Sequence, residues 1–424
     1  MPRSFLPSAA LLTLALVVGA CSESTGPGAE PITELPRELS VSEREVVERS
    51  NVFGLGLLRQ VAAADDRPNV VLSPLSASMA LGMTLNGARE GTFAAMRETL
   101  GFGTMSQEEI NGAYRDLIDL LSGLDPDVRF TIANGIWANE DVTFRDAFFD
   151  AVADAFDAET RSSDFGDPAT LEQINGWVED RTEGYIDEIL ESLDPDLVML
   201  LVNAIYFDGA WTTRFDPERT APGTFLRADG SEVTADMMSM SDAEVSLGGG
   251  PDHQAAELPY GGGAFAMTIV VPSGDVREFV AGLDEARWSS IVDGLGAPSE
   301  IDLLSLPKLE VAYDAWLNDA LRAMGMEVAF TDAADFTGMS EEGGLCIDFV
   351  RQKTFLQVDE AGTKAAAATA VGVRPTSFNG FVVDRPFVLA IRERLSGSLL
   401  FVGVIGDPTV GDAPEPEPQE GCGA

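Results

Sequence analysis

Histidine is almost absent from this chain of 424 residues, since His253 is the only one. A Ser-His-Asp or Cys-His catalytic site would have to use this residue, and the chain has no G-x-S-x-G nucleophile elbow. One histidine and three cysteines are also too few for a metal site built from clusters of these residues. The sequence therefore argues against an enzyme, and it predicts no metal and no cofactor.

Basic residues are scarce as well. The chain has 27 Lys and Arg residues against 70 Asp and Glu residues, so its formal net charge is −43. Such a surface repels nucleic acid and anionic lipid, which argues against either as a partner. We expect most of the acidic side chains to form a solvated surface.

Cysteine is too rare for a disulfide framework. Besides Cys21, only Cys346 and Cys422 occur. Even in an exported protein, so few cysteines do not imply a framework of disulfides. A bridge between these two residues is left open by the sequence. Cys422 lies in the ending GDAPEPEPQEGCGA, and the Pro/Glu alternation predicts that residues 411–424 form a disordered acidic tail.

One long hydrophobic run is present, at the start of the chain. Arg3, the apolar run that follows and the small residues before Cys21 are typical of a secretory signal over residues 1–21, too short to span a membrane comfortably. The ending VGAC resembles a bacterial lipobox, in which Cys21 would be lipidated; simple secretion is the alternative. Residues 22–42 are predicted to be a flexible linker. We expect an exported protein, either lipid-anchored in a bacterial envelope or secreted, with membrane contact through the anchor alone.

The body, residues 43–410, is predicted to be one large α+β domain. Helical spacing occurs first, strand-like runs dominate later, and regular βαβ alternation is missing. A Ser-Pro break at Ser73 and Pro74 precedes an apolar helix that we expect to be buried. The other expected helices cover residues 46–61, 144–156 and 171–190, and the first expected strands cover residues 130–139 and 197–211.

Eight blocks of sequence lie along this body in a fixed order. They are NVVLSPLSASMALGMTLNGAREGT, TIANGIWAN, INGWVEDRTEGYIDEIL, LVNAIYFDGAW, AELPY, LPKLEV, DEAGTKAAAAT and VVDRPFVLAIRERLSGSLLFVGVIGDP. In order and spacing they resemble the blocks that define serpins, over about residues 43–408. The resemblance implies a serpin fold with about three β-sheets, eight to nine helices and an exposed reactive-centre loop, in a monomer.

The resemblance also implies a function. A serpin offers its loop as bait to a serine protease, holds the protease as an acyl-enzyme after cleavage, and inserts the loop as a new strand into the central sheet. The implied partner is thus a target serine protease, bound covalently. A non-inhibitory serpin used as a binding module is the alternative; hinges of such relatives often carry bulky or charged inward residues.

The hinge of that loop corresponds to the stretch EAGTKAAAAT. Local propensity would favour a helix here, but a segment that must become a central strand needs small side chains on its inward face. Glu360 ends the preceding strand, and Gly362 supplies backbone freedom. On the family's pattern the inward residues are Thr363, Ala365, Ala367 and Thr369, and the outward ones are Lys364, Ala366, Ala368 and Ala370.

Five further residues match positions that control the opening of the central sheet in the family. Ser73 and Ser76 match a polar cluster beneath the opening, and Asn203 contributes to it from a neighbouring strand. Trp211 matches the aromatic residue at the point where the loop first enters. Gln352 stands where the family usually has histidine, and its amide cannot titrate near neutral pH.

The cleaved bond is predicted to be Thr376-Ser377, from the family's spacing after Glu360. Counting back from Pro386 gives Pro375-Thr376 instead, but proline before the bond suits few serine proteases. Thr376 would suit an elastase-like or subtilisin-like enzyme with a shallow specificity pocket. Arg374 is a trypsin-like option disfavoured by Pro375, and Phe378 is a chymotrypsin-like option.

Overall fold

The computed structural model describes residues 31–362 and 379–411, together with Gln419 and Cys422. The helices are α1 (Val41–Ala64), α2 (Pro74–Leu85), α3 (Glu90–Thr99), α4 (Gln107–Ser122), α5 (Asp146–Phe156), α6 (Pro168–Arg181), α7 (Val276–Ala281), α8 (Glu285–Asp293) and α9 (Asn318–Leu321). Short helical turns cover Pro217–Arg219, Arg322–Met326 and Glu327–Phe330.

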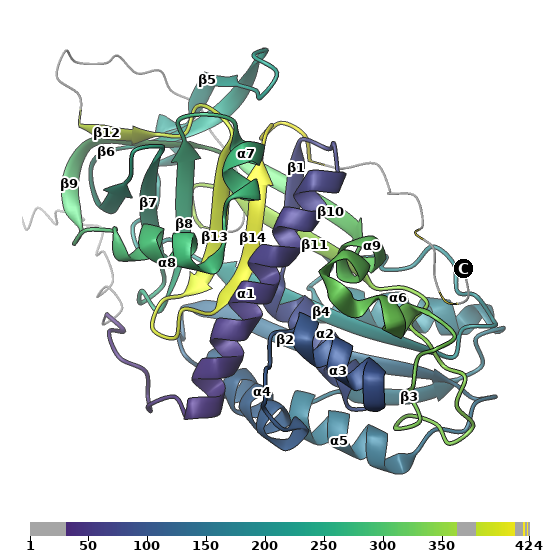
Figure 1. Cartoon of the computed structure of the whole chain (residues 1–424). Coiled ribbons are helices and arrows are strands. Elements are labelled where there is room, and N and C mark those ends of the chain that lie inside the picture. Colours follow the sequence, from purple (N-terminus) through teal and green to yellow (C-terminus); the bar gives the residue numbers. More distant parts are fainter. Residues whose placement is uncertain (1–30, 363–378, 412–418, 420–421, 423–424) are drawn as a thin grey trace, which may run out of the picture.

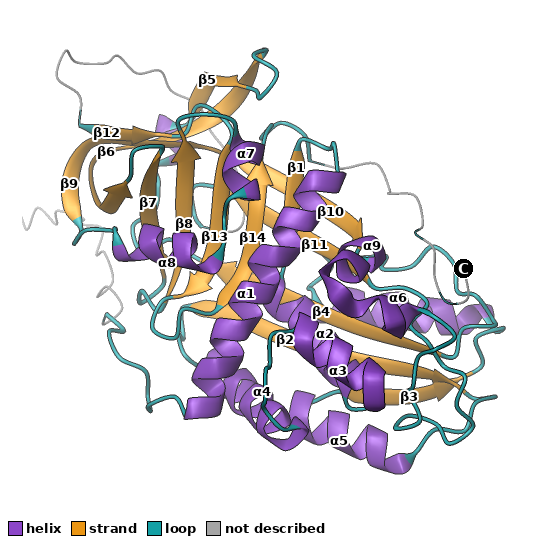
Figure 2. Cartoon of the chain, viewed as in Figure 1, coloured by secondary structure: helices purple, strands orange, loops and turns teal. Residues whose placement is uncertain are grey.

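The strands are more numerous in the second half of the chain, as the sequence predicts (Figure 2). They are β1 (Asn69–Leu72), β2 (Val128–Asn139), β3 (Glu159–Ser163), β4 (Met199–Gly209), β5 (Ala221–Leu226), β6 (Glu232–Gly249), β7 (His253–Tyr260), β8 (Phe265–Pro272), β9 (Ser299–Pro307), β10 (Leu309–Trp316), β11 (Arg351–Val358), β12 (Gly380–Val382), β13 (Phe387–Glu393) and β14 (Leu399–Ile405).

Pairing of these strands gives three sheets. A nine-stranded sheet has the order β1-β14-β13-β8-β7-β6-β9-β12, with β5 paired to β6. A three-stranded sheet has the order β3-β2-β4, and β10 and β11 form a two-stranded sheet. With nine α-helices in the described part of the chain, the α+β class and the expected numbers of sheets and helices are confirmed.

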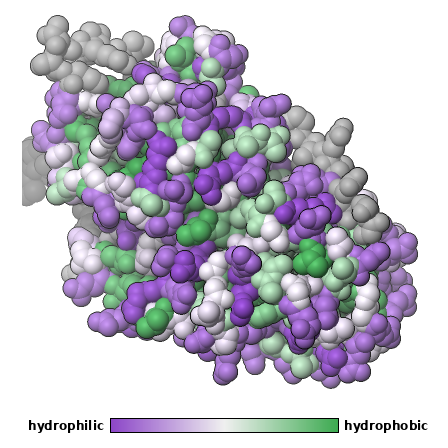
Figure 3. Space-filling view, viewed as in Figure 1, coloured by the Kyte–Doolittle hydropathy of each residue, from purple (hydrophilic) through white to green (hydrophobic). Residues whose placement is uncertain are grey.

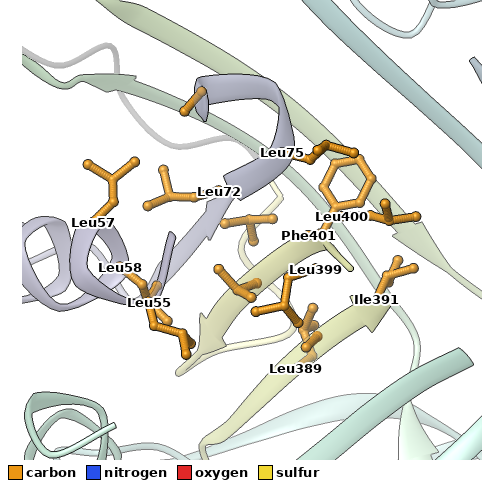
Figure 4. Packing of buried hydrophobic residues seen from close by; sticks show 14 of the residues in the cluster. Leu55, Leu57, Leu58, Leu72, Leu75, Leu389, Ile391, Leu399, Leu400 and Phe401 are labelled. Atoms are coloured by element: carbon orange, nitrogen blue, oxygen red, sulfur yellow. The ribbon is translucent and has the colours of Figure 1, made fainter. Parts of the chain in front are cut away.

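The main core lies where α1 and α2 pack on β13 and β14 (Figure 4). Both strands are buried along their whole length, including the two charged residues that end β13, Arg392 and Glu393. Helix α2 is buried on almost every face, as its sequence predicts. The leucines that meet between these elements include Leu55, Leu57, Leu58, Leu75, Leu389 and Leu399.

Side-chain caps set the beginnings of these helices. Ser40 and Glu43 form a capping box at α1, and the Ser73 hydroxyl accepts a hydrogen bond from the Ser76 backbone N–H at α2. Pro74 occupies the first turn of α2, where a missing N–H costs nothing. Ser73 therefore has a structural role in addition to any role in the sheet.

One expected helix is shorter than predicted. The apolar spacing favoured a helix over residues 171–190, but α6 ends at Arg181, so that prediction was wrong for the last nine residues. Glu183 and Gly184 both have positive φ, at 55° and 80°, which a right-handed helix cannot contain. The Thr182 hydroxyl accepts a hydrogen bond from the Ile186 N–H and redirects the chain across the sheet.

The surface agrees with the acidic composition. Figure 3 shows hydrophilic residues spread over the visible face, with hydrophobic residues in small groups between them. Within the described residues, no helix has the length and apolar character needed to cross a membrane. Cys346 and Cys422, whose pairing the sequence left open, form a disulfide with a Cα–Cα distance of 5.7 Å.

Candidate functional site

The central feature of the site is a division between β4 and β11. Strand β4 pairs with β2, and β11 pairs with β10; in the described part of the chain neither strand has a partner on its other edge. Residues of both strands line the same cavities, so the two unpaired edges face each other (Figure 1). Unpaired edges are templates for a further strand.

Two cavities occupy the division. The larger, of about 290 Å³, lies between the first residues of β4 and β11, and α2 forms its floor. The smaller, of about 30 Å³, lies nearer the other end of both strands, beside Ile205 and Phe355. A cavity needs roughly 10–15 Å³ to hold one water molecule. The larger cavity is many times this size, so atoms of an inserted strand could occupy it.

Gly362 closes the end of the division that we call the mouth. Its φ is 148°, and a Cβ placed on it would lie 2.1 Å from the Gly209 carbonyl oxygen. It forms an antiparallel bridge with Ala210, which directly follows β4. No residue with a side chain fits here, so the predicted hinge glycine is required by the close approach of two backbones as well as by conformational freedom.

Glu360 is buried at the mouth and neutralised there. It is 2% exposed; its Oε1 accepts a hydrogen bond of 2.6 Å from the Thr220 hydroxyl, and its Oε2 lies 2.9 Å from the Lys308 ammonium. Burial alone would raise the pKa of Glu360, but the bonds from Thr220 and Lys308 outweigh burial and lower that pKa. The end of β11 is thus tied to two other parts of the chain.

Trp211 covers the same mouth. Its indole stacks on Tyr260 with ring centroids 4.4 Å apart, and its Nε1–H donates a 2.8 Å hydrogen bond to the Asp359 carbonyl. The Trp211 backbone N–H donates to the Ala361 carbonyl. Trp211 therefore holds the backbone at Asp359 and Ala361 from the β4 side, where the resemblance predicts an aromatic residue.

Asp359 is a second buried carboxyl at the mouth. One of its oxygens accepts a hydrogen bond from the Ala361 backbone N–H, and the other, Oδ2, has no hydrogen-bond partner among the described residues. Burial raises the pKa of Asp359, the neighbouring Glu360 adds to the rise, and the Ala361 N–H and Lys308 oppose it. The mouth thus contains one carboxyl that is stabilised in its charged form and one that is not.

Beneath the division, the start of α2 is bonded to β11. The Ser73 N–H donates 2.9 Å to the Gln352 Oε1, and the Gln352 Nε2 donates 3.0 Å to the Ser73 carbonyl. The Ser73 hydroxyl donates to the Leu400 carbonyl of β14. Gln352 uses both ends of its amide, a pairing that requires a donor and an acceptor in one side chain.

The next turn of α2 is bonded to β4 in the same way. The Ser76 hydroxyl donates to the Asn203 Oδ1, and the Asn203 Nδ2 donates 2.5 Å to the Asn134 Oδ1 on β2. Asn134 in turn donates to the Phe156 carbonyl at the end of α5. The structure therefore brings Ser73, Ser76, Asn203 and Gln352 together under both edges of the division.

Two contacts cross the division from the segment that follows α6. The Tyr185 ring lies between Tyr206 of β4 and Phe355 of β11, with centroid distances of 5.8 and 4.9 Å. The Lys353 ammonium of β11 donates to the Glu188 carbonyl. This segment, which the sequence wrongly predicted to be helical, is the latch that spans the two edges.

The remaining predicted site residues lie outside the described residues. These are the hinge residues Thr363, Ala365, Ala366, Ala367, Ala368 and Thr369, the reactive-bond candidates Arg374, Pro375, Thr376, Ser377 and Phe378, and Cys21.

Sequence reasoning did not single out Lys308, Thr220, Asp359, Asn134 or Tyr185. Lys308 was within reach, because it lies in the quoted block LPKLEV, and a lysine among apolar residues requires a partner. In the part of the chain that the structure describes, no group of three or more His, Cys, Asp or Glu side chains is placed to hold a metal ion.

A family model and several known proteins match this chain over most of its length. The model of a family described as "Serpin (serine protease inhibitor)" matches residues 48–408. Serpin A3-6 of Bos taurus is 30% identical over 414 residues, covering 93% of this chain and 96% of its own length. Ipis-1 of Ixodes persulcatus is 33% identical over 375 residues, covering 83% and 96%.

Solved structures agree with the sequence relatives. The thermophilic serpin tengpin in its native state has 30% sequence identity and a TM-score of 0.77, covering 90% of this chain and 97% of its own. Thyroxine-binding globulin in complex with thyroxine has 27% identity and a TM-score of 0.79, covering 86% and 100%.

Proposed function

The chain belongs to the serpin family, and we propose that it is a suicide inhibitor of a serine protease, which its reactive loop traps as an acyl-enzyme while inserting between β4 and β11. The observation that carries the proposal is the division itself, with two unpaired edges facing each other and the loop leaving directly from its mouth. In this role the protein would bind its target covalently rather than turn it over.

Two hydrogen-bonded positions at the mouth fix the register of an inserted strand. The Asp359 N–H donates 2.9 Å to the Gly362 carbonyl, which closes a two-residue turn. Each residue further along the loop would then lie opposite one residue earlier in β11, so Thr369 would lie opposite Gln352. The bridge between Ala210 and Gly362 gives a second register along β4, in which Thr369 would lie opposite Asn203.

The agreement of the two registers supports insertion as a single central strand. Gln352 and Asn203 both bond to the start of α2 beneath the sheet. Because directly opposed residues share a face, Thr369 would point inward, and so would every second residue back to Thr363. This inward set is opposite the buried residues of β11, which alternate along the strand with half-exposed ones. Small side chains suit that face.

The same registers support the choice of reactive bond. Continued past Arg351 and Met199, where β11 and β4 begin, they would bring Thr376 opposite Leu345 on one side and Asp196 on the other, and both of these residues line the larger cavity. A strand ending at Thr376 would therefore run to the far end of the division. About a dozen new ladder hydrogen bonds at roughly 0.5–1.5 kcal/mol each would release on the order of 10 kcal/mol.

Lys364 would lie on the outward face in this register. The opposed residues are Gln357 of β11 and Asp208 of β4, so the ammonium would meet the Asp208 carboxylate. Where the family more often has an acid, this chain has a lysine, and that lysine would face a carboxylate on the sheet.

Trapping is tested on denaturing gels. The full chain is incubated with elastase-, subtilisin-, trypsin- and chymotrypsin-type proteases, and the released C-terminal peptide is weighed by mass spectrometry. A band at the combined mass that resists denaturant supports the proposal, and a peptide beginning at Ser377 supports Thr376 as the reactive residue. Cleavage by every enzyme without such a band would contradict it.

A non-inhibitory serpin that serves as a binding module is the second candidate. The likeness to thyroxine-binding globulin in complex with thyroxine favours it. The small inward residues from Thr363 to Thr369 oppose it, because a loop that need not insert can carry any side chain there. Melting of the cleaved chain separates the two, since only an inserted loop raises the melting temperature sharply.

We further propose an exported monomer, with Cys21 as a lipid anchor. The disulfide between Cys346 and Cys422 supports export, because such bonds persist mainly in oxidising compartments. Labelled palmitate should be incorporated into the wild-type chain and lost in Cys21→Ala. Incorporation that persists in that variant would contradict the anchor.

A further inference from the structure

The C-terminal end of the chain is fastened beside the larger cavity, far from the mouth. The Gly411 carbonyl accepts a hydrogen bond from the Ala312 N–H of β10, and the Gln419 side chain accepts one from the Asp319 N–H of α9. Cys422 is bonded to Cys346, and its N–H donates 3.3 Å to the Asp348 carboxylate. The end of the chain thus meets the segment that leads into β11.

That lead-in segment has little pairing of its own. Residues 341–350 contain no helix or strand, and most are only half-buried. The backbone is held by a bond from the Ile347 N–H to the Ala329 carbonyl, by one from the Asn318 side-chain amide to the Asp348 carbonyl, and by bonds between Val350 and the neighbouring Leu317 and Asn318. The disulfide adds a covalent tie to these bonds and to the packing of Phe349 on Trp316.

The disulfide also forms part of the cavity wall. Both Cys346 and Cys422 line the cavity of about 290 Å³, together with Leu345 and Asp196. These last two residues are the ones that the two registers place opposite Thr376. The end of an inserting loop would therefore arrive directly beside the disulfide.

We propose that the Cys346–Cys422 disulfide is a redox-controlled brake on the last part of loop insertion. The proposal rests on the proposed function. In the oxidised protein the disulfide holds Cys422 in the wall of the cavity at the far end of the division, and the final residues of the loop would have to displace it. Once the bond is reduced, Cys422 can leave the wall and the lead-in to β11 can yield.

The chemistry requires an external thiol reductant. A dithiol such as dithiothreitol supplies two electrons and two protons, the protein disulfide becomes two thiols, and the reductant closes to its own cyclic disulfide. Attack needs access to one sulfur of the bond. Cys422 is exposed and Cys346 is half-buried, so the reductant has a route to the bond in the folded protein.

The test measures the rate of insertion in both redox states. The full chain is cut with chymotrypsin, and the peptide mass is used to confirm the cut after Phe378. Backbone hydrogen exchange of β4 and β11 then follows insertion, since both free edges gain partners. We expect protection to appear roughly threefold faster in the reduced protein, because even a small decrease in the free-energy barrier to loop insertion changes the rate by about this factor.

Variants separate the brake from a general effect of the reductant. The loop of Cys422→Ser should insert as fast as that of the reduced wild-type protein, with or without reductant in the buffer. Cys346→Ser, which breaks the same bond from its other end, should behave as Cys422→Ser does. Melting temperature is a weak criterion, because losing any disulfide lowers it.

The possible failures are distinguishable. Equal rates in oxidised and reduced protein, or a slower rate after reduction, would overturn the brake while leaving loop insertion standing. If neither strand gains protection in either redox state after the cut, the loop does not insert, and the proposed function fails together with the brake.

Discussion

If the chain inhibits by the proposed loop insertion, a charge on the predicted inward face of the hinge should make it a substrate that is cleaved without trapping. In the proposed inserted register, residue 363 would lie opposite Val358, which is 1% exposed, and opposite the buried Gly209. In Thr363→Arg the guanidinium would have to enter this apolar layer without a partner. Burying an unpaired charge costs several kcal/mol, while the inserted strand gains on the order of 10 kcal/mol.

The cost of burying this charge would slow loop insertion. If about 4 kcal/mol of the cost is felt in the transition state for insertion, the rate falls by up to roughly a thousandfold. Hydrolysis of the acyl-enzyme then precedes trapping, and the protease is released. Insertion, rather than cleavage, is the step that the substitution affects.

The assay is the stoichiometry of inhibition, with the melting temperature of the uncleaved chain as a check on folding. Thr363→Arg should be cleaved at the same bond as the wild type and should form little or no denaturant-resistant complex. Lys364→Arg is the matched control, because it carries the same group one residue along, on the outward face, and should trap normally. If Thr363→Arg trapped protease at the wild-type ratio, the assignment of the inward face would be refuted.

Three further predictions concern the division and its mouth. Gly362→Ala should lower the stability of the uncleaved chain by roughly 1–3 kcal/mol, since the Cβ would lie 2.1 Å from the Gly209 carbonyl oxygen; an unchanged melting temperature would contradict the close approach. Asp359→Asn should stabilise the uncleaved chain at neutral pH and flatten the fall of its stability as pH rises above the ordinary aspartate range; identical pH profiles of melting for the variant and the wild type would contradict the buried charge. Lys353→Met removes the bond to the Glu188 carbonyl across the division, worth about 1 kcal/mol, and should speed insertion several-fold; an unchanged rate of protection would show that the latch is not limiting.

The sequence predicted those features that depend on local pattern. The apolar face of α2, its Ser-Pro beginning and the alternation in β11 follow from spacing along a few residues, and the structure contains each of them. The hinge glycine could also be anticipated, because only glycine tolerates the required backbone. Its close contact with Gly209 could not, since that contact joins distant parts of the chain.

Partners that are distant in sequence were out of reach for the same reason. Glu360 bonds to Thr220 across 140 residues and to Lys308 across 52, and no periodicity links such positions. Two consecutive left-handed residues after Thr182 ended α6 early, although the apolar spacing continued. Because the chain has 70 Asp and Glu residues, the sequence alone did not indicate which of these carboxylates are buried.

The exchange of histidine for Gln352 moves any pH response of the sheet to a different place. The Gln352 amide donates to and accepts from Ser73 whatever the pH, so the bond between β11 and α2 is constant. At the mouth, burial first of all raises the pKa of Asp359. The unfolded chain therefore loses this proton at a lower pH than the folded chain, and the folded state loses stability as pH rises between the two pKa values. Above both values the loss is complete and constant. Between these two sites the pH response therefore belongs to Asp359 at the mouth, while the bonds between Gln352 and Ser73 under the sheet do not change with pH.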